Sequence, residues 1–165
     1  MNKPPGHVDR VGRWDRASGQ GAVVTHPLFD PDQFVEAAAD AIIAADADGS
    51  IVFWNSAAER IFGYSRDEAL AKTLDIIIPE RLRQRHAEGY VRVMRTGVTK
   101  YGADVLRVPA VHKDGHALSI AFTVTLMSAA GQRRLIVATV RDETQRWQEE
   151  RSLRQRLAAL EAANR

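Results

Sequence analysis

Hydrophobic residues fall in short runs separated by polar turns. Apolar runs of strand length occur at 41–46 (AIIAAD) and 51–54 (IVFW), and the Asp48-Gly49 pair between them is a strong hairpin signal. At 117–126 every second residue is large and apolar, and the residues between are Ser, Ala or Thr. A period of two predicts a strand with one buried face. The pattern therefore predicts an opening hairpin and a later return to strands.

Helical patterns lie before and between these strands. FVEAAA at 34–39 predicts a short leading helix. Three short helices are predicted within 56–78, and the first two are expected to open with capping boxes. The two boxes are Ser56 with Glu59 and Ser65 with Glu68. Residues 79–97 predict one longer helix that starts near Pro79 and ends at Gly97.

The second half of the chain predicts strands and then a final helix. Strands are expected at 101–112 and 135–141, on either side of the alternating strand. Two hairpins that flank a helical insert predict the α+β class, with a five-stranded antiparallel sheet and helices across one face. From Thr144 the chain is predicted to be helical. Its leucines recur at spacings of four and three, as in coiled coils: Leu153, Leu157 and Leu160.

Composition excludes several classes of function. The chain has 165 residues and a net charge of only +2, which does not favour nucleic-acid binding. It has no cysteine, so disulfides, thiol nucleophiles, c-type heme and a flavin–cysteine adduct are excluded. Neither a signal peptide nor a membrane-spanning run is visible, and a cytoplasmic protein is expected. No catalytic carboxylate pair, nucleophile with a base, or phosphate-binding loop is recognisable, so we expect no enzyme activity.

The helix at 79–97 carries the most specific candidate for a ligand site. Leu82, His86, Tyr90 and Val93 follow helical spacing, which places His86 on an apolar stripe. An imidazole in that position can bind heme iron through one nitrogen. A hydrogen-bonded structural histidine remains the alternative. The arginines at 81, 83, 85, 92 and 95 are expected to form a solvated face of this helix.

Three motifs resemble the PAS (S-box) family. They are N-x-A-A-E-x-x-F-G-Y-S at 55–65, K-D-G at 113–115 and R-D-E-T at 141–144. The resemblance implies a PAS fold that binds a small molecule or a partner between the helices and the inner face of the sheet. It also implies a signal relayed through the exit helix. We therefore expect a weakly ordered segment at 1–33, a PAS sensor domain at 34–143, and a C-terminal amphipathic or coiled-coil signalling helix at 144–165.

The segment around His86 also resembles the heme-binding PAS domains of FixL-type oxygen sensors. This resemblance implies b-type heme with His86 as the proximal ligand. It assigns Arg92 and Lys100 to the heme propionates. Three further positions fall on the distal wall: Tyr101, Phe122 and Val124. Leu106 stands where the relatives carry a distal arginine, while the adjacent Arg107 is expected on the opposite face of the strand.

Three functions remain open. One is a heme sensor of a diatomic gas (CO, NO or O2) or of redox state. Another is a cofactor-free PAS module that forms a homodimer or binds a kinase or regulator. The third is a PAS pocket for another small organic ligand. His112 and His116 flank the K-D-G turn and can bind a metal ion, although such a pair is more often an exposed turn pair.

Overall fold

The described strands form one five-stranded antiparallel sheet, as the sequence predicts, and their order across it is β2-β1-β5-β4-β3. The computed structural model describes residues 29–99, 104–128 and 134–163. The chain divides into two units, residues 1–30 and 31–165, and every element named below belongs to the second unit. The strand bounds are β1 Ala41–Ala45, β2 Ile51–Trp54, β3 Leu106–Val111, β4 Ala117–Ser128 and β5 Arg134–Asp142.

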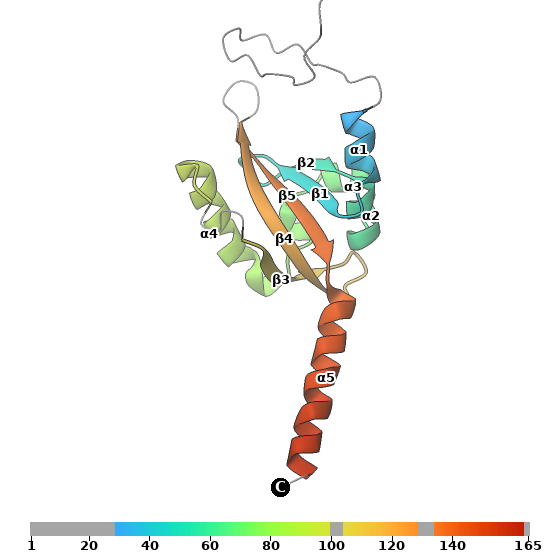
Figure 1. The fold of residues 1–165 in the computed structure, drawn as a ribbon. Helices are drawn as coiled ribbons and strands as arrows, with labels where there is room; N and C mark the ends of the chain where they lie inside the picture. Colours follow the sequence, from blue (N-terminus) through green and yellow to red (C-terminus); the bar gives the residue numbers. More distant parts are fainter. Residues whose placement is uncertain (1–28, 100–103, 129–133, 164–165) are drawn as a thin grey trace, which may run out of the picture. The chain divides into compact units, whose positions relative to one another are not determined.

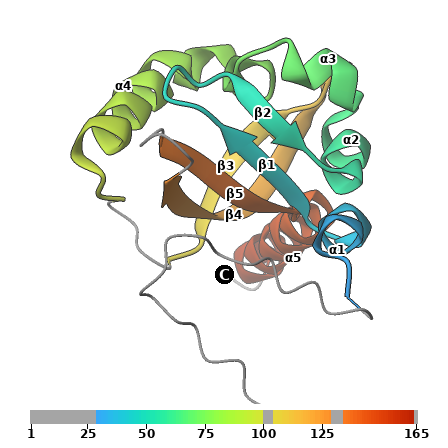
Figure 2. The ribbon, with the colours of Figure 1, turned by 90° about the horizontal axis from the view of Figure 1, so that it is seen from above.

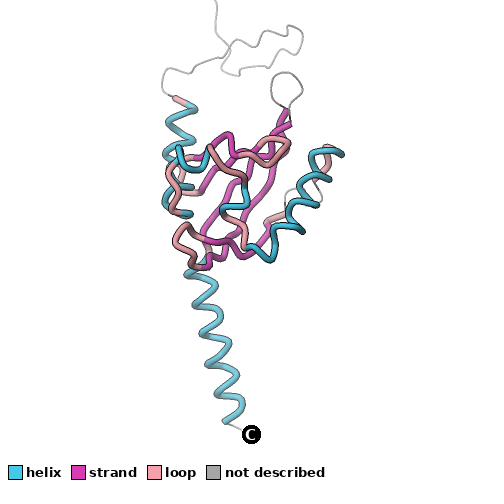
Figure 3. The backbone as a smooth tube through the Cα atoms, turned by 180° about the vertical axis from the view of Figure 1, so that it is seen from behind, coloured by secondary structure: helices cyan, strands magenta, loops and turns pink. Residues whose placement is uncertain are grey.

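The helices lie between β2 and β3 in sequence, apart from one at each end of this unit (Figure 1). Their bounds are α1 Pro31–Ala37, α2 Ser56–Phe62, α3 Arg66–Leu70, the short 3-10 helix η1 Leu74–Ile76, α4 Glu80–Thr96 and α5 Thr144–Ala163. Figure 2 shows α2, α3 and α4 along the same side of the sheet. Seen from behind, the strands lie between α4 on one flank and α1 with α2 on the other (Figure 3).

Two helix starts differ from the sequence-based expectation. Helix α1 begins at Pro31 rather than at residue 34, and proline suits a first helical position because no partner is needed for its nitrogen. The capping box expected at Ser56 and Glu59 is wrong. Asn55 caps α2 instead, because its side chain accepts a 3.0 Å hydrogen bond from the backbone N–H of Ala58.

Other predicted boundaries are confirmed. The capping box of Ser65 and Glu68 opens α3. Gly97 ends α4 with φ of 72°, a left-handed conformation that favours glycine. In the described residues β3 begins only at Leu106, later than the predicted strand start; residues 101–103 lie outside the described ranges.

The core lies between the helices and the inner face of the sheet. Leu118 and Ile120 of β4 are buried on this face, together with Ile43 of β1 and Val140 of β5. The alternation of β4 thus places its large apolar residues inward, as predicted. None of the helices in the described ranges is long and apolar enough to cross a lipid bilayer.

Candidate functional site at helix α4

Helix α4 presents one apolar stripe and one charged face. Tyr90 is buried, and the rest of the stripe is half-buried: Leu82, His86, Val93 and Met94. The arginines of this helix are all exposed, which confirms the predicted solvated face: Arg81, Arg83, Arg85, Arg92 and Arg95. His86 therefore faces the protein interior from an otherwise basic helix.

The imidazole of His86 lies beside the phenol ring of Tyr90. Their ring centroids are 5.8 Å apart, and the planes are tilted by 38°. Burial lowers the pKa of His86, and the negative charge of Asp75 only partly opposes this effect. Neither ring nitrogen of His86 hydrogen-bonds to a residue that the structure describes. The imidazole is therefore held neutral near physiological pH, which is the form that binds metals.

An apolar sheet surface lies opposite α4. Val124 and Leu126 of β4 join the hydrophobic cluster that contains Tyr90. Phe122 precedes them on the same inner face and pairs across the ladder with Leu106 of β3. Leu118 and Ile120 are buried at 6% and 5% exposure, whereas Phe122, Val124 and Leu126 are only half-buried. The inner face is thus less completely covered on the side toward α4.

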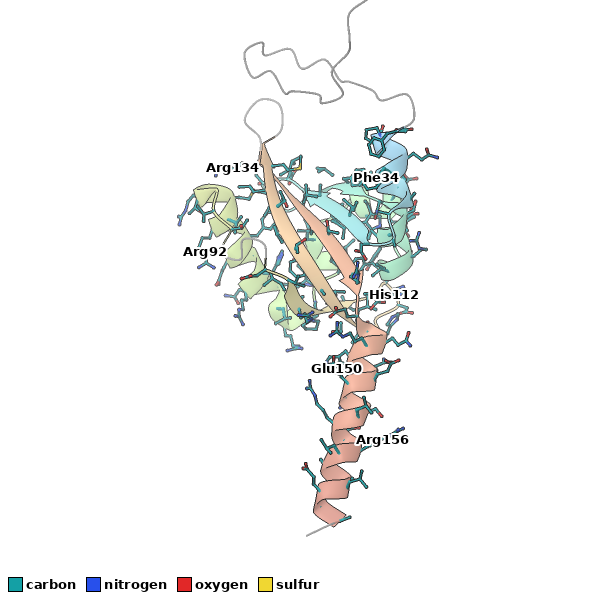
Figure 4. All side chains as sticks on the ribbon, viewed as in Figure 1. Phe34, Arg92, His112, Arg134, Glu150 and Arg156 are labelled. Atoms are coloured by element: carbon teal, nitrogen blue, oxygen red, sulfur yellow. The ribbon has the colours of Figure 1, made fainter. Side chains whose placement is uncertain are left out.

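Two polar contacts hold α4 in place. The hydroxyl of Tyr90 donates a hydrogen bond to the backbone carbonyl of Asp46, just beyond β1. The guanidinium of Arg134 donates to the backbone carbonyl of Met94 near the end of the helix. Figure 4 shows Arg134 at the start of β5, on the side of the sheet that carries α4. The helix that carries His86 is therefore connected to both β1 and β5.

The predicted site residues are only partly brought together. His86, Tyr90 and Val124 gather around one apolar cluster, and Phe122 and Leu106 lie further along the same face. Arg92 is exposed on α4 and joins neither core cluster (Figure 4). Two predicted residues, Lys100 and Tyr101, lie outside the described ranges.

Arg107 faces away from this cluster, as its register predicts. It pairs with Ala121, whereas Leu106 pairs with Phe122 on the inner face. The Arg107 side chain forms a 3.0 Å ion pair with Glu143, just before α5. Leu106 therefore occupies the position nearest to Phe122, and no strand slip replaces it by the arginine.

The described residues fit the central part of a heme site. Heme needs an iron ligand with a free nitrogen and apolar surfaces for the porphyrin. No described residue hydrogen-bonds to the ring nitrogens of His86, and Phe122 and Val124 provide a half-buried apolar surface. These residues correspond to the iron ligand and to one apolar wall of a heme site. Of the two predicted propionate partners, Arg92 and Lys100, the structure describes only Arg92.

Sequence reasoning missed the residues that position this helix. The contact of Arg134 with α4 joins residues 40 positions apart, and no local motif signals it. The hydrogen bond of Tyr90 to Asp46 spans 44 positions. Tyr90 was expected in the apolar stripe, but a hydrogen bond to a turn carbonyl leaves no sequence pattern.

Comparisons with known proteins agree with this fold. The family described as PAS fold matches residues 30–142. An uncharacterized protein of Azorhizobium caulinodans is 38% identical over 72% of this chain. The oxygen sensor protein DosP of Escherichia coli and the sensor protein FixL of Bradyrhizobium diazoefficiens are each 31% identical over 70% of the chain. The chain spans only 16%, 14% and 23% of these three relatives, respectively.

Solved structures show the same architecture. A PAS domain from Colwellia psychrerythraea has a TM-score of 0.57 at 20% identity and covers 69% of this chain and 94% of its own. A PAS domain from Desulfitobacterium hafniense has a TM-score of 0.56 at 15% identity and covers 67% and 98%. These identities support the fold alone. The sheet order, the helices on its inner face and the family match together show that this chain belongs to the PAS family and carries a PAS sensory domain.

Proposed function

We propose that this PAS domain is a heme-based sensor in which His86 is the iron ligand. The observation that carries the proposal is the neutral, half-buried imidazole of His86, which has no hydrogen-bond partner among the described residues and lies beside an incompletely covered apolar face. The 31% identity to a protein named as an oxygen sensor supports the same class of signal. Sensing would need no catalytic step in this chain.

The residues of the chain would each contribute a simple physical role. Bound b-type heme would supply an iron atom that takes up a diatomic gas or changes its redox state. His86 would hold the group through one ring nitrogen, and Phe122 and Val124 would exclude water from the other side. Arg92 and Lys100 are proposed for the propionates, since a guanidinium and an ammonium both pair with carboxylates.

The apolar distal wall bears on the choice of gas. Leu106 offers no hydrogen-bond donor, and the neighbouring Arg107 is engaged with Glu143 on the other face. A ligand that depends on a donated hydrogen bond, such as O2, would gain nothing from these two side chains. We therefore propose that CO or NO is favoured over O2.

A continuous set of contacts connects this region to the exit helix. Arg134 joins the end of α4 to β5, and β5 continues into α5 after Glu143. At this junction the backbone N–H of Ser119 donates a 2.9 Å hydrogen bond to Thr144 Oγ1. We propose that a change at α4 alters β5 and thereby the start of α5, which would pass the signal to a second copy, a kinase or another regulator.

A hemin titration tests the proposal. We expect the full chain to give a sharp Soret band that His86→Ala loses or strongly shifts. His116→Ala is the matched control, because His116 lies on an exposed turn; it should bind hemin like the wild type. A wild-type spectrum identical to that of free hemin would overturn the proposal and would direct the search to another organic ligand.

A second function is favoured by one observation on α5. Leu153, Leu157 and Leu160 are 63%, 58% and 64% exposed, although they recur at coiled-coil spacing. A cofactor-free PAS module that pairs through this helix would account for them. This function predicts a colourless protein that is dimeric without any added ligand.

A further inference from the structure

The hairpin turn between β3 and β4 places two imidazoles and a carboxylate together. The backbone N–H of His112 donates a 3.0 Å hydrogen bond to the carbonyl of His116, so these residues face each other across the turn. Gly115 has φ of 94°, which closes the turn in a conformation that favours glycine. The two imidazole rings stack with centroids 4.4 Å apart. Turn geometry thus brings both rings to one side.

One carboxylate oxygen of Asp114 contacts both rings. Its Oδ1 atom is 2.5 Å from His116 Nδ1 and 3.0 Å from His112 Nδ1. One oxygen and two nitrogens, one from each residue, all lie within 4.8 Å of one another. Two donors bound to the same zinc ion lie about 3.3 Å apart, given zinc–ligand distances of about 2.0–2.1 Å. The spacings of 2.5 and 3.0 Å between Asp114 Oδ1 and the two imidazole nitrogens are shorter than this, so an ion would have to move the carboxylate and the rings slightly apart.

The rest of the fold holds His112 in a defined orientation. A Cβ built on Gly63 would come 2.4 Å from His112 Nε2, so the ring lies directly against this glycine at the end of α2. Nε2 is therefore turned toward the protein, and Nδ1 toward Asp114. The backbone N–H of Lys113 donates a 2.9 Å hydrogen bond to the carbonyl of Phe62, which fixes the turn to the same helix end. His112 is thus held in place before any ion arrives, and the ion would replace the 3.2 Å hydrogen bond that the backbone N–H of Asp114 donates to His112 Nδ1.

We propose that His112, Asp114 and His116 bind a divalent transition-metal ion of the zinc class. Two imidazole nitrogens and one carboxylate oxygen suit zinc, cobalt or nickel, whereas calcium and magnesium require more oxygen ligands. Three protein ligands leave at least one position for water. The site is independent of His86 and does not depend on heme binding. Its ion would connect both ends of the β3–β4 turn next to α2.

Titration of the metal-free full chain with Zn²⁺ tests the proposal. We expect one equivalent to bind to the wild type and equally to His86→Ala. His116→Gln and Asp114→Asn should each weaken binding by about tenfold or more. These two substitutions roughly preserve side-chain size on an exposed turn, so a loss of binding reports the loss of a ligand atom. His112→Ala is less suitable, because it would open a gap against Gly63.

Two spectroscopic measurements identify the ligand atoms. Cobalt(II) added to the wild type should give visible absorption of a nitrogen- and oxygen-bound ion, and His116→Gln should reduce it. Nitrogen NMR of the imidazoles should show that Zn²⁺ shifts His112 Nδ1 rather than Nε2. Absence of stoichiometric binding in the wild type would overturn the proposal. Equal affinity of the wild type and the double variant D114N/H116Q would overturn it as well.

Discussion

The guanidinium of Arg134, at the start of β5, donates a 2.6 Å hydrogen bond to the backbone carbonyl of Met94 in the last turn of α4. A second bond of 3.1 Å reaches the carbonyl of Arg95. These carbonyls have no partners within the helix, and a positive charge at a helix C-terminus is favourable. Gly97 allows the close approach, because a Cβ there would lie 3.2 Å from the guanidinium carbon. The sheet thus caps the helix that carries His86.

Replacing Arg134 by leucine should lower the free energy of unfolding by about 1.5 kcal/mol, because two carbonyls lose a charged donor. Urea denaturation followed by circular dichroism measures the change. Arg154→Leu is the control: this side chain is 81% exposed and forms an ion pair with Glu150 one turn away. An equal effect of both substitutions would contradict a capping role for Arg134.

Replacing Tyr90 by phenylalanine should cost about 1 kcal/mol of stability, because Asp46 loses its hydrogen-bond donor while the ring volume stays the same. Tyr64→Phe is a matched control, since the hydrogen bond of the Tyr64 hydroxyl to the carbonyl of Ile76 is long at 3.5 Å. Urea denaturation of both variants measures the difference. A stability of Tyr90→Phe equal to that of the wild type would show that the Asp46 contact contributes little.

Tyr90 should also make stability depend on alkaline pH. Burial raises the pKa of Tyr90 above its ordinary value, and the nearby charges of Asp46 and Asp48 raise it further. The folded state therefore holds this proton more tightly than the unfolded state. The contribution of Tyr90 is complete below about pH 10, the ordinary tyrosine pKa, and is lost as the pH rises toward the folded-state pKa.

Unfolding measurements between about pH 9 and pH 11 check this dependence. The stability of the wild type should fall more steeply with pH than that of Tyr90→Phe, so the difference between them should shrink. Absorbance at the phenolate wavelength should show one tyrosine that ionises only with unfolding. Parallel pH curves for the two proteins would rule out a raised pKa at this residue.

Local patterns predicted most of the fold, because strand alternation and turn residues act over a few positions. The capping box of Ser65 and Glu68 is an example, since all its bonds lie within one turn. The box at Ser56 failed because Asn55 is a better cap there. Its buried side chain also donates to the carbonyls of Val35 and Asp40. Those contacts are tertiary, and helical spacing alone does not reveal them.

The candidate site was predictable to a smaller extent. The stripe of α4 located His86 and Tyr90, because helical periodicity determines which side chains face inward. Strand register likewise separated Leu106 from Arg107. The role of Arg134 was not predictable, since its contact depends on how the start of β5 meets the end of α4. Arg92 is exposed and lies outside the buried stripe of α4. Its predicted role depends on the resemblance alone.

The exposed leucines of α5 predict self-association. No described residue of α5 is buried, so the helix makes little apolar contact within its own chain. Leu153, Leu157 and Leu160 would become buried if two copies of the helix paired, and each leucine contributes roughly 1.5–3 kcal/mol when fully buried. We therefore expect a dimer by sedimentation equilibrium, with the mass falling toward one chain when the three leucines are changed to glutamine.

Glutamine retains helix propensity, so the substitutions test the contact rather than the helix. Arg156→Gln lies on the same helix and serves as the control; it should leave the dimer intact (Figure 4). Circular dichroism of the triple variant should show the helical content of a folded PAS domain. If the triple variant keeps the wild-type mass, the association does not use this helix, and the exposed face of the sheet becomes the surface to test. A wild type that is already monomeric would instead leave α5 available for a different partner protein.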